Sequence, residues 1–279
     1  MKNLGYYNGV FDEIENMQIP MNDRVCYFGD GVYDATYSRN YKIYELNEHI
    51  DRLYRSASLL RIEIAQTKEE MKEILNEMVK KMDTGENFVY WQVTRGTGKR
   101  NHVFPEEGKA NLWINIFPKG LVDQSKKIKT ITEEDTRFYH CNIKTLNLLP
   151  NVMASQKAKE HDCFEAIFHR GERVTECAHS NVHIIKDGKV KTAPLDNLIL
   201  PGITRAHLIG LCKRLGIEVI EEAFTLDELF NADEIMVSSA GAFCLGVEEI
   251  DGKKVGGKNE ELLTLIQKEM MNDFINATN

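Results

Sequence analysis

Apolar residues recur at helical spacing in three stretches of the chain. The first follows Asn47, which can cap a helix, and returns an apolar side chain every three or four positions. Thr67 and Glu70 form a capping box before the second stretch, which Gly85 closes. The third begins at Asn259. We therefore predict three amphipathic helices, each with one face against a core.

Shorter runs rich in aromatic and β-branched residues predict strands. The clearest of these runs are residues 88–95, 112–117, 165–168, 182–185 and 234–237.

A polar, glycine-containing stretch separates the two halves of this pattern. Residues 119–127 are typical of an interdomain linker. The sequence thus predicts an α+β protein with an N-terminal domain at 1–118 and a C-terminal domain at 128–279.

Composition narrows the class of protein. The 279 residues are 42% hydrophobic and 28% charged, as in globular proteins, and the net charge of −8 argues against a nucleic-acid partner. No run approaches the roughly 18 apolar residues of a membrane span, and the N-terminus has no apolar signal region. Six scattered cysteines without a Cys-x-x-Cys pair indicate reduced thiols. We expect a cytoplasmic protein with no membrane partner and no metal site.

Lys144 has an unusual setting for a lysine. Ile143 precedes it and three leucines follow within five positions. Burial among apolar side chains disfavours an ammonium ion, and a neutral amine can condense with a carbonyl group. Most lysines are solvated surface charges, so the remaining motifs have to decide between these alternatives.

Two segments could bind an anion. The loop 94–105 holds three positive charges and His102, with Arg100 able to offer a bidentate fork. Pro201 and Gly202 lead into a helix whose free N–H groups, with Thr204, could bind a phosphate, although a routine helix entry fits equally well.

Other candidates have equally plain structural alternatives. Arg52 lies at the edge of its helical stripe, as a solvated arginine or an anion ligand. Tyr33 follows the tight bend 29–31, which is either a surface turn or a functional loop. Small residues at 238–241 would let a ligand approach the backbone. Arg137 could line a site or pair with an acidic neighbour.

One chemistry uses these pieces together. Pyridoxal phosphate needs an amine for its aldehyde, an anion site for its phosphate and an acid for its ring nitrogen. Lys144 could supply the amine and then carry a proton as a general base. Glu176, an isolated acid in a strand-rich region, could supply the acid.

The chain also resembles the class IV pyridoxal-phosphate aminotransferases. The similar segments are 48–53, 142–147, 174–182, 201–205 and 238–241. The resemblance implies a smaller N-terminal α/β domain and a larger, β-barrel-like C-terminal domain with helices, with the cofactor in the cleft between them. It implies these cofactor-binding residues: Arg52, Lys144, Glu176, Ile203, Thr204, Ser239 and Ala240.

Within that family, the loop 100–105 resembles the D-amino-acid branch. There Tyr33, Arg100 and His102 would trap the substrate carboxylate, with the loop reaching in from a dimer partner. The resemblance implies a homodimer that converts D-alanine and 2-oxoglutarate to pyruvate and D-glutamate. The alternatives are an L-branched-chain aminotransferase, an aminodeoxychorismate lyase and, more remotely, a non-enzymatic module that binds an anion.

Two departures from the family pattern bear on cofactor affinity and substrate range. Ala240 lacks a hydroxyl that the family often offers to the phosphate. Cys177, Ala178 and His179 replace a run of glycine and serine, so His179 could crowd or retune the site.

Overall fold

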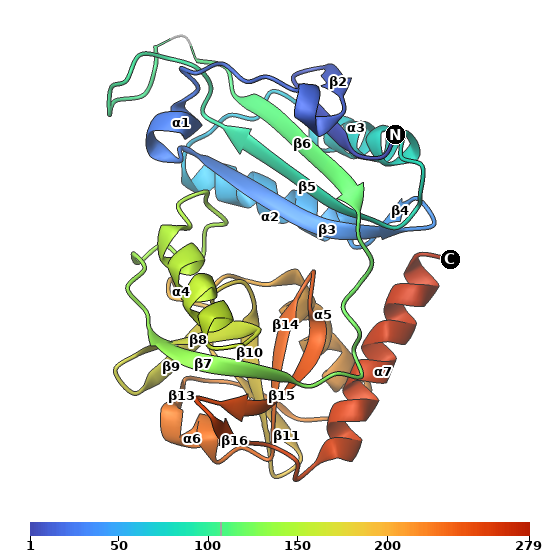
Figure 1. The fold of residues 1–279 in the computed structure, drawn as a ribbon, viewed down its shortest axis with the longest axis vertical. Coiled ribbons are helices and arrows are strands. Elements are labelled where there is room, and N and C mark those ends of the chain that lie inside the picture. Colours follow the sequence, from blue (N-terminus) through green and yellow to red (C-terminus); the bar gives the residue numbers. More distant parts are fainter. Residues whose placement is uncertain (107) are drawn as a thin grey trace. The chain divides into compact units, whose positions relative to one another are not determined.

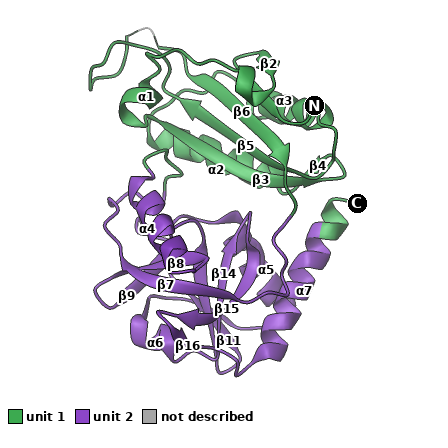
Figure 2. Cartoon of the chain, viewed as in Figure 1, with its two compact units in different colours: residues 1–120, 143–147, 275–279 green, residues 121–142, 148–274 purple. Residues whose placement is uncertain are grey.

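The computed structural model describes residues 1–106 and 108–279. The chain forms two compact units, coloured separately in Figure 2. The first comprises Met1–Gly120, Ile143–Asn147 and Ile275–Asn279, and the second comprises Leu121–Asn142 and Leu148–Phe274.

The division begins inside the predicted linker but differs from the predicted domains in two places. Ile143–Asn147 and Ile275–Asn279 belong to the first unit, whereas the sequence placed all of 128–279 in one domain. The first of these segments carries Lys144. It joins the first unit because its backbone bonds to a strand there.

The first unit is a six-stranded antiparallel sheet with strand order β2-β1-β6-β5-β3-β4 (Figure 1). The strands are β1 (Leu4–Tyr7), β2 (Val10–Asp12), β3 (Gly31–Arg39), β4 (Lys42–Ile43), β5 (Asn87–Thr94) and β6 (Asn111–Pro118). The helices are a 3₁₀ turn (Ile14–Asn16), α1 (Arg24–Phe28), α2 (Leu46–Leu59) and α3 (Lys68–Lys80). Helix α2 packs on β3 and α3 packs on α2, which buries one face of the sheet.

Alternation along the strands gives this sheet two different faces. In β5, Val89, Trp91 and Val93 are buried in the core that α2 and α3 cover. Tyr90 and Gln92 therefore point to the opposite face, because successive side chains of a strand alternate. The opposite face also holds Tyr33, which lies directly across from Gln92.

The second unit is built on a curled ten-stranded mixed sheet (Figure 1). Its order is β12-β11-β10-β14-β15-β7-β8-β9-β13, with β16 paired to β15. The strands are β7 (Ile128–Glu134), β8 (Glu165–Arg170), β9 (Arg173–Cys177), β10 (Asn181–Lys186), β11 (Lys189–Thr192), β12 (Val219–Glu221), β13 (Phe224–Thr225), β14 (Glu234–Ser239), β15 (Phe243–Ile250) and β16 (Lys253–Lys254). The helices are α4 (Leu149–Glu160), α5 (Ile203–Arg214), α6 (Leu226–Phe230) and α7 (Glu260–Ala277).

The predicted α+β class and the five strands are confirmed, with strand ends shifted by at most two residues. The capping box of Thr67 and Glu70 is present, and α7 begins next to Asn259. Two helix ends were wrong. Asn47 lies inside α2, which Glu45 precedes in a left-handed conformation, and α3 ends at Lys80, before Gly85. Among the described residues, every helix is too short or too polar to cross a bilayer.

Candidate active site

Lys144 lies on a short segment that is bonded to β3. The Tyr33 N–H donates to the Lys144 carbonyl oxygen at 3.0 Å, and the Leu146 N–H donates to the Gly31 carbonyl oxygen at 3.1 Å. Val32 and Thr145 form an isolated antiparallel bridge between these bonds. The backbone of Lys144 is therefore held by the same pairing that holds a strand in a sheet.

The side chain of Lys144 contacts an aromatic ring. Its Nζ lies 4.3 Å from the centre of the Tyr33 ring, which stacks on Tyr90 at 5.5 Å. Lys144 and Tyr33 are both half-buried. An amine over an aromatic face is favourably placed, and the ring fixes one side of its surroundings. The structure thus brings together two of the predicted site residues.

Arg52 is a fixed guanidinium rather than a solvated one. Its Nε and Nη2 donate to the two carboxyl oxygens of Asp34 at 2.9 and 2.7 Å, and His49 Nδ1 lies 2.7 Å from the same carboxyl. Burial acts to raise the pKa of Asp34, but Arg52 and His49 outweigh it and hold that pKa well below its usual range. The bidentate pair sets the direction of the Arg52 fork.

Arg100 and His102 lie together on the exposed loop after β5. The Phe28 ring lies 5.2 Å from His102 and 5.5 Å from the Arg100 guanidinium carbon. Within the described part of the chain, no hydrogen bond or ring contact joins either residue to Tyr33. Arg100 and His102 thus share the Phe28 ring, whereas Tyr33 contacts Lys144 and Tyr90.

Asp30 anchors this loop, a role that sequence reasoning missed. Its carboxyl accepts from Arg24 Nε at 2.8 Å and from Arg95 Nε at 2.9 Å. Arg24 also donates to the Asn101 carbonyl oxygen at 2.7 Å, and the Phe104 ring lies 3.7 Å from the Arg95 guanidinium. The predicted tight bend at 29–31 thus stabilises the loop through the ion pairs of Asp30.

Replacing Asp30 with asparagine is expected to lower the free energy of unfolding by about 2 kcal/mol. The change leaves two mostly buried guanidinium groups without their carboxylate. Urea unfolding would measure it, and Asp51→Asn, which breaks the exposed ion pair with Lys68, should change stability by less than about 1 kcal/mol. Equal losses in the two variants would contradict the anchoring role.

Glu176 is buried on β9 and receives three hydrogen bonds. Arg137 Nη1 donates to Oε1 at 2.5 Å, while Asn181 Nδ2 and the Leu200 N–H both donate to Oε2 at 3.0 Å. Burial is the strongest influence and raises the pKa of Glu176 to about 7, although Arg137 acts to lower it. A carboxyl that titrates near neutrality can exchange a proton with a bound base.

The raised pKa gives a testable dependence of stability on pH. A carboxyl with a folded pKa of about 7 and an ordinary value of 4.5 stabilises the fold fully below pH 4.5, and that stabilisation is lost as the pH rises through 7. Relative to Glu176→Gln, the cofactor-free protein should lose roughly 2 kcal/mol between about pH 5 and about pH 8. Urea unfolding of both proteins at both pH values measures the difference in free energy of unfolding. A difference that does not change with pH would contradict the raised pKa.

Arg137 pairs with acidic neighbours, which was one of the two alternatives left open by the sequence. It pairs with Asp135 through Nε at 2.9 Å and Nη2 at 3.0 Å, and it contacts Glu176. Arg170 donates to the same Asp135 at 3.1 Å. The cluster of Asp135, Arg137, Arg170 and Glu176 holds two carboxyls and two guanidinium groups, so charge is balanced in a buried place.

The start of α5 is tied to Glu176 through Asn181. Gly202 precedes the helix, and Ile203 and Thr204 form its first turn, whose N–H groups have no partner inside the helix. A side chain at Gly202 would place its Cβ 2.1 Å from Asn181 Oδ1, so any larger residue would displace the Asn181 side chain. The helix start is thus packed against the residue that bonds Glu176, with its positive end and buried Thr204 available to an anion.

The two departures from the family pattern occupy turns. Ser239 Oγ accepts the Ala242 N–H at 3.0 Å, and Ala240 lies half-buried in the same turn, where it offers only its backbone. His179 Nδ1 lies 2.8 Å from the buried carboxyl of Glu165, which also accepts the Ser180 hydroxyl at 2.7 Å. Glu165 therefore holds the His179 ring in place.

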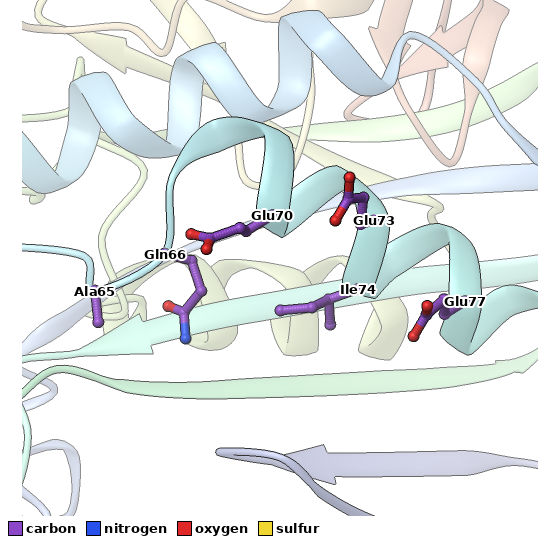
Figure 3. Close-up of a pocket in the computed structure, with 6 residues that line it drawn as sticks. All are labelled: Ala65, Gln66, Glu70, Glu73, Ile74 and Glu77. Carbon is purple, nitrogen blue, oxygen red and sulfur yellow. The ribbon is translucent and has the colours of Figure 1, made fainter.

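The cavity in Figure 3 does not belong to this set of residues. It measures about 350 Å³ and lies along α3, where Ala65, Gln66, Glu70, Glu73, Ile74 and Glu77 line it. Its Glu70 carboxyl is used in the capping box with Thr67. No predicted site residue lines this cavity, and its acidic wall is unsuited to a phosphate or carboxylate.

Comparison with known proteins decides the family. The family model for class IV amino-transferases matches residues 31–250, which include every predicted site residue. The chain is a class IV aminotransferase.

Relatives of this class IV aminotransferase match it over nearly its whole length. The D-alanine aminotransferase of Listeria monocytogenes serotype 1/2a (strain 10403S) is 42% identical over 271 residues, which cover 95% of this chain and 94% of the relative. The D-alanine aminotransferase of Staphylococcus haemolyticus is 38% identical over 275 residues, which cover 98% of each.

Solved structures share the fold. The Escherichia coli branched-chain amino acid aminotransferase has a TM-score of 0.90 at 23% identity and covers 100% of this chain and 97% of its own. The branched-chain aminotransferase of the archaeon Thermoproteus uzoniensis has a TM-score of 0.86 at 22% identity, with 96% and 95% covered. These likenesses confirm the two-domain fold that the resemblance implied.

Pyridoxal 5′-phosphate is the cofactor of a class IV aminotransferase, and it needs an amine, an acid for its ring nitrogen and a site for its phosphate. Lys144 offers an amine, Glu176 a buried carboxyl and the first turn of α5 a set of N–H donors. Among the described residues, no group of three His, Cys, Asp or Glu side chains could hold a metal ion.

Proposed function

We propose that this aminotransferase transfers the amino group of D-alanine to 2-oxoglutarate, which yields pyruvate and D-glutamate. The observation that carries the proposal is the 42% identity to a D-alanine aminotransferase across 95% of the chain. The resemblance of Tyr33 and of the loop with Arg100 and His102 to the D-amino-acid branch of the family supports the same substrate class.

Lys144 performs the proton transfer. Bound pyridoxal phosphate supplies an aldehyde for the amine and a ring that accepts electrons from the substrate Cα. Lys144 would hold the cofactor through its Nζ. Once freed, Nζ would take the proton from the substrate Cα as a general base and deliver it, as a general acid, to the cofactor carbon that carried the aldehyde. The bonds of its backbone to β3 keep Nζ over one face of Tyr33.

Glu176 holds a proton at the ring nitrogen of the cofactor. A pKa of about 7 places this carboxyl close to the acidity of a ring nitrogen, so the proton can be shared between them. The N–H donors of Asn181 and Leu200 fix the carboxyl without neutralising it. Arg137 keeps the cluster ionised when the proton moves to the ring.

Three elements bind the phosphate in this proposal. The N–H groups of Ile203 and Thr204, with the Thr204 hydroxyl, meet it at the positive end of α5. Arg52, directed by Asp34, adds a guanidinium. Ser239 and Ala240 add backbone N–H groups, since the Ser239 oxygen already accepts within its turn.

Tyr33, Arg100 and His102 bind the substrate carboxylate. Arg100 and His102 are exposed in a single chain, and both contact the Phe28 ring. We infer that they complete the trap of a second copy, which makes the enzyme a homodimer, and that the homodimer acts in the cytoplasm. Lys144 reaches Cα from one side, so the position of the carboxylate decides which enantiomer presents its proton.

Substrate assays test the proposal. Purified protein loaded with pyridoxal phosphate should release pyruvate from D-alanine in the presence of 2-oxoglutarate. L-leucine with 2-oxoglutarate and aminodeoxychorismate alone serve as the two rival substrates. Faster turnover of either rival would reject the D-amino-acid assignment. A colourless preparation that gains no borohydride-stable cofactor would reject the enzyme and favour a simple anion-binding module.

A further inference from the structure

His183 is a buried histidine in the centre of β10. Its exposed fraction is 0%, and its neighbours in sequence, Val182 and Ile184, are core residues. The ring bonds to two hydroxyls on the flanking strands: Nδ1 lies 2.9 Å from Thr192 Oγ1 on β11, and Nε2 lies 2.7 Å from Ser238 Oγ on β14. The three side chains form one chain of hydrogen bonds across three strands.

The direction of these bonds follows from the protons available. The Thr192 hydroxyl donates to the Val182 carbonyl oxygen at 3.3 Å, so its oxygen accepts the Nδ1–H of His183. Burial, together with the charge of Arg205, lowers the pKa of His183 to about 3, so the ring carries a single proton. Nε2 is then an acceptor, and the Ser238 hydroxyl donates to it.

The bond fixes Ser238 at the end of β14, where the turn with Ser239 and Ala240 begins. Asn181 lies across from Ser238 in the β10–β14 register, and His183 lies two residues further along the same face of β10. Asn181 bonds Glu176 and packs against Gly202 at the start of α5. One face of one strand therefore positions the acid, the helix start and the turn.

We propose that His183 is a positioning residue for the cofactor phosphate: by holding Ser238 it sets the turn 239–242 against the start of α5. Helix α5 packs on β14, so the turn and the helix start belong to one packed unit. This inference rests on the proposed function, which assigns the phosphate to these two elements. His183 itself touches neither substrate nor cofactor.

The experiment compares pyridoxal phosphate with pyridoxal, which lacks the phosphate but keeps the aldehyde and the ring. Their dissociation constants are measured by titrating cofactor-free protein and following the absorbance of the lysine-bound form. His183→Phe keeps a ring of similar size but removes both hydrogen bonds. The variant should raise the dissociation constant of pyridoxal phosphate about tenfold, since one lost hydrogen bond is worth about tenfold in binding. The dissociation constant of pyridoxal should change by less than about twofold.

Two further variants make the result specific. Ser238→Ala removes the same bond with a smaller change in packing and should give the same selective loss, and the double variant should lose no more than either single one. Ile250→Val destabilises the same core by roughly 1 kcal/mol at the far end of β15 and should leave the ratio of the two affinities unchanged.

The outcomes separate this inference from the proposed function. The inference is overturned if both His183→Phe and Ser238→Ala keep the wild-type ratio of the affinities for pyridoxal phosphate and pyridoxal, even where both affinities fall. His183 then has only a structural role. If wild-type protein binds neither compound through a lysine, both the proposed function and this inference are rejected.

Discussion

Lys144→Ala is expected to lower transamination by roughly 10⁴-fold or more, because it removes the amine to which the proposed function assigns cofactor attachment and proton transfer. Pyruvate release from D-alanine measures the rate. The variant should also take up pyridoxal phosphate without the yellow colour of the lysine-bound form, and borohydride should fix no cofactor to the chain.

Matched lysine variants control this result. Lys144→Arg keeps a long basic side chain, but its guanidinium stays protonated, so it should be as inactive as the alanine variant. Lys268→Ala removes an exposed lysine of α7 and should retain wild-type activity and colour. If cofactor is still fixed to Lys144→Ala by borohydride, another lysine is the attachment point and the assignment is wrong.

Arg137→Met is expected to lower the free energy of unfolding by about 3–5 kcal/mol, the usual cost of removing one partner from a buried ion pair. Glu176 and Asp135 would both lose their strongest donor, and their carboxyls have no exposed side to turn to. The pKa of Glu176 would rise further, because the burial that already raises it would act without the guanidinium. Urea unfolding at neutral pH measures the loss.

Two comparisons decide whether the loss comes from uncompensated charge. Arg214→Met breaks an exposed pair with Asp273 and should change stability by less than about 1 kcal/mol. Arg137→Met combined with Glu176→Gln should recover part of the loss, since the carboxyl left without a guanidinium partner is then replaced by a neutral amide, while Asp135 keeps Arg170. A double variant whose losses simply add would show that Arg137 acts by packing on Phe168 instead.

The elements that sequence predicts well are those set by neighbouring residues. The capping box of Thr67 and Glu70 acts within one helical turn, so four letters of sequence contain all of it. Asn47 failed as a cap because any favourable side chain can also lie inside a helix, and here a left-handed Glu45 begins the turn. Gly85 failed as an end because the chain leaves α3 before it.

Side-chain partners in the candidate site depend on strand register, which the sequence does not display. Asp34 meets Arg52 across 18 positions and Glu176 meets Arg137 across 39, through the pairing of whole strands and helices. The motifs still pointed to the right family, whose model matches residues 31–250. His183 left one local signal, a polar side chain inside an otherwise apolar strand.

The backbone bonds between the segment of Lys144 and β3 join two parts of the chain that lie on either side of the linker. A gene cut within the linker would give one fragment that keeps β3 without the lysine, and another that keeps the lysine without the strand supporting it. Neither fragment would contain both the segment of Lys144 and the strand that supports it. The backbone setting of Lys144 therefore exists only in the uninterrupted chain.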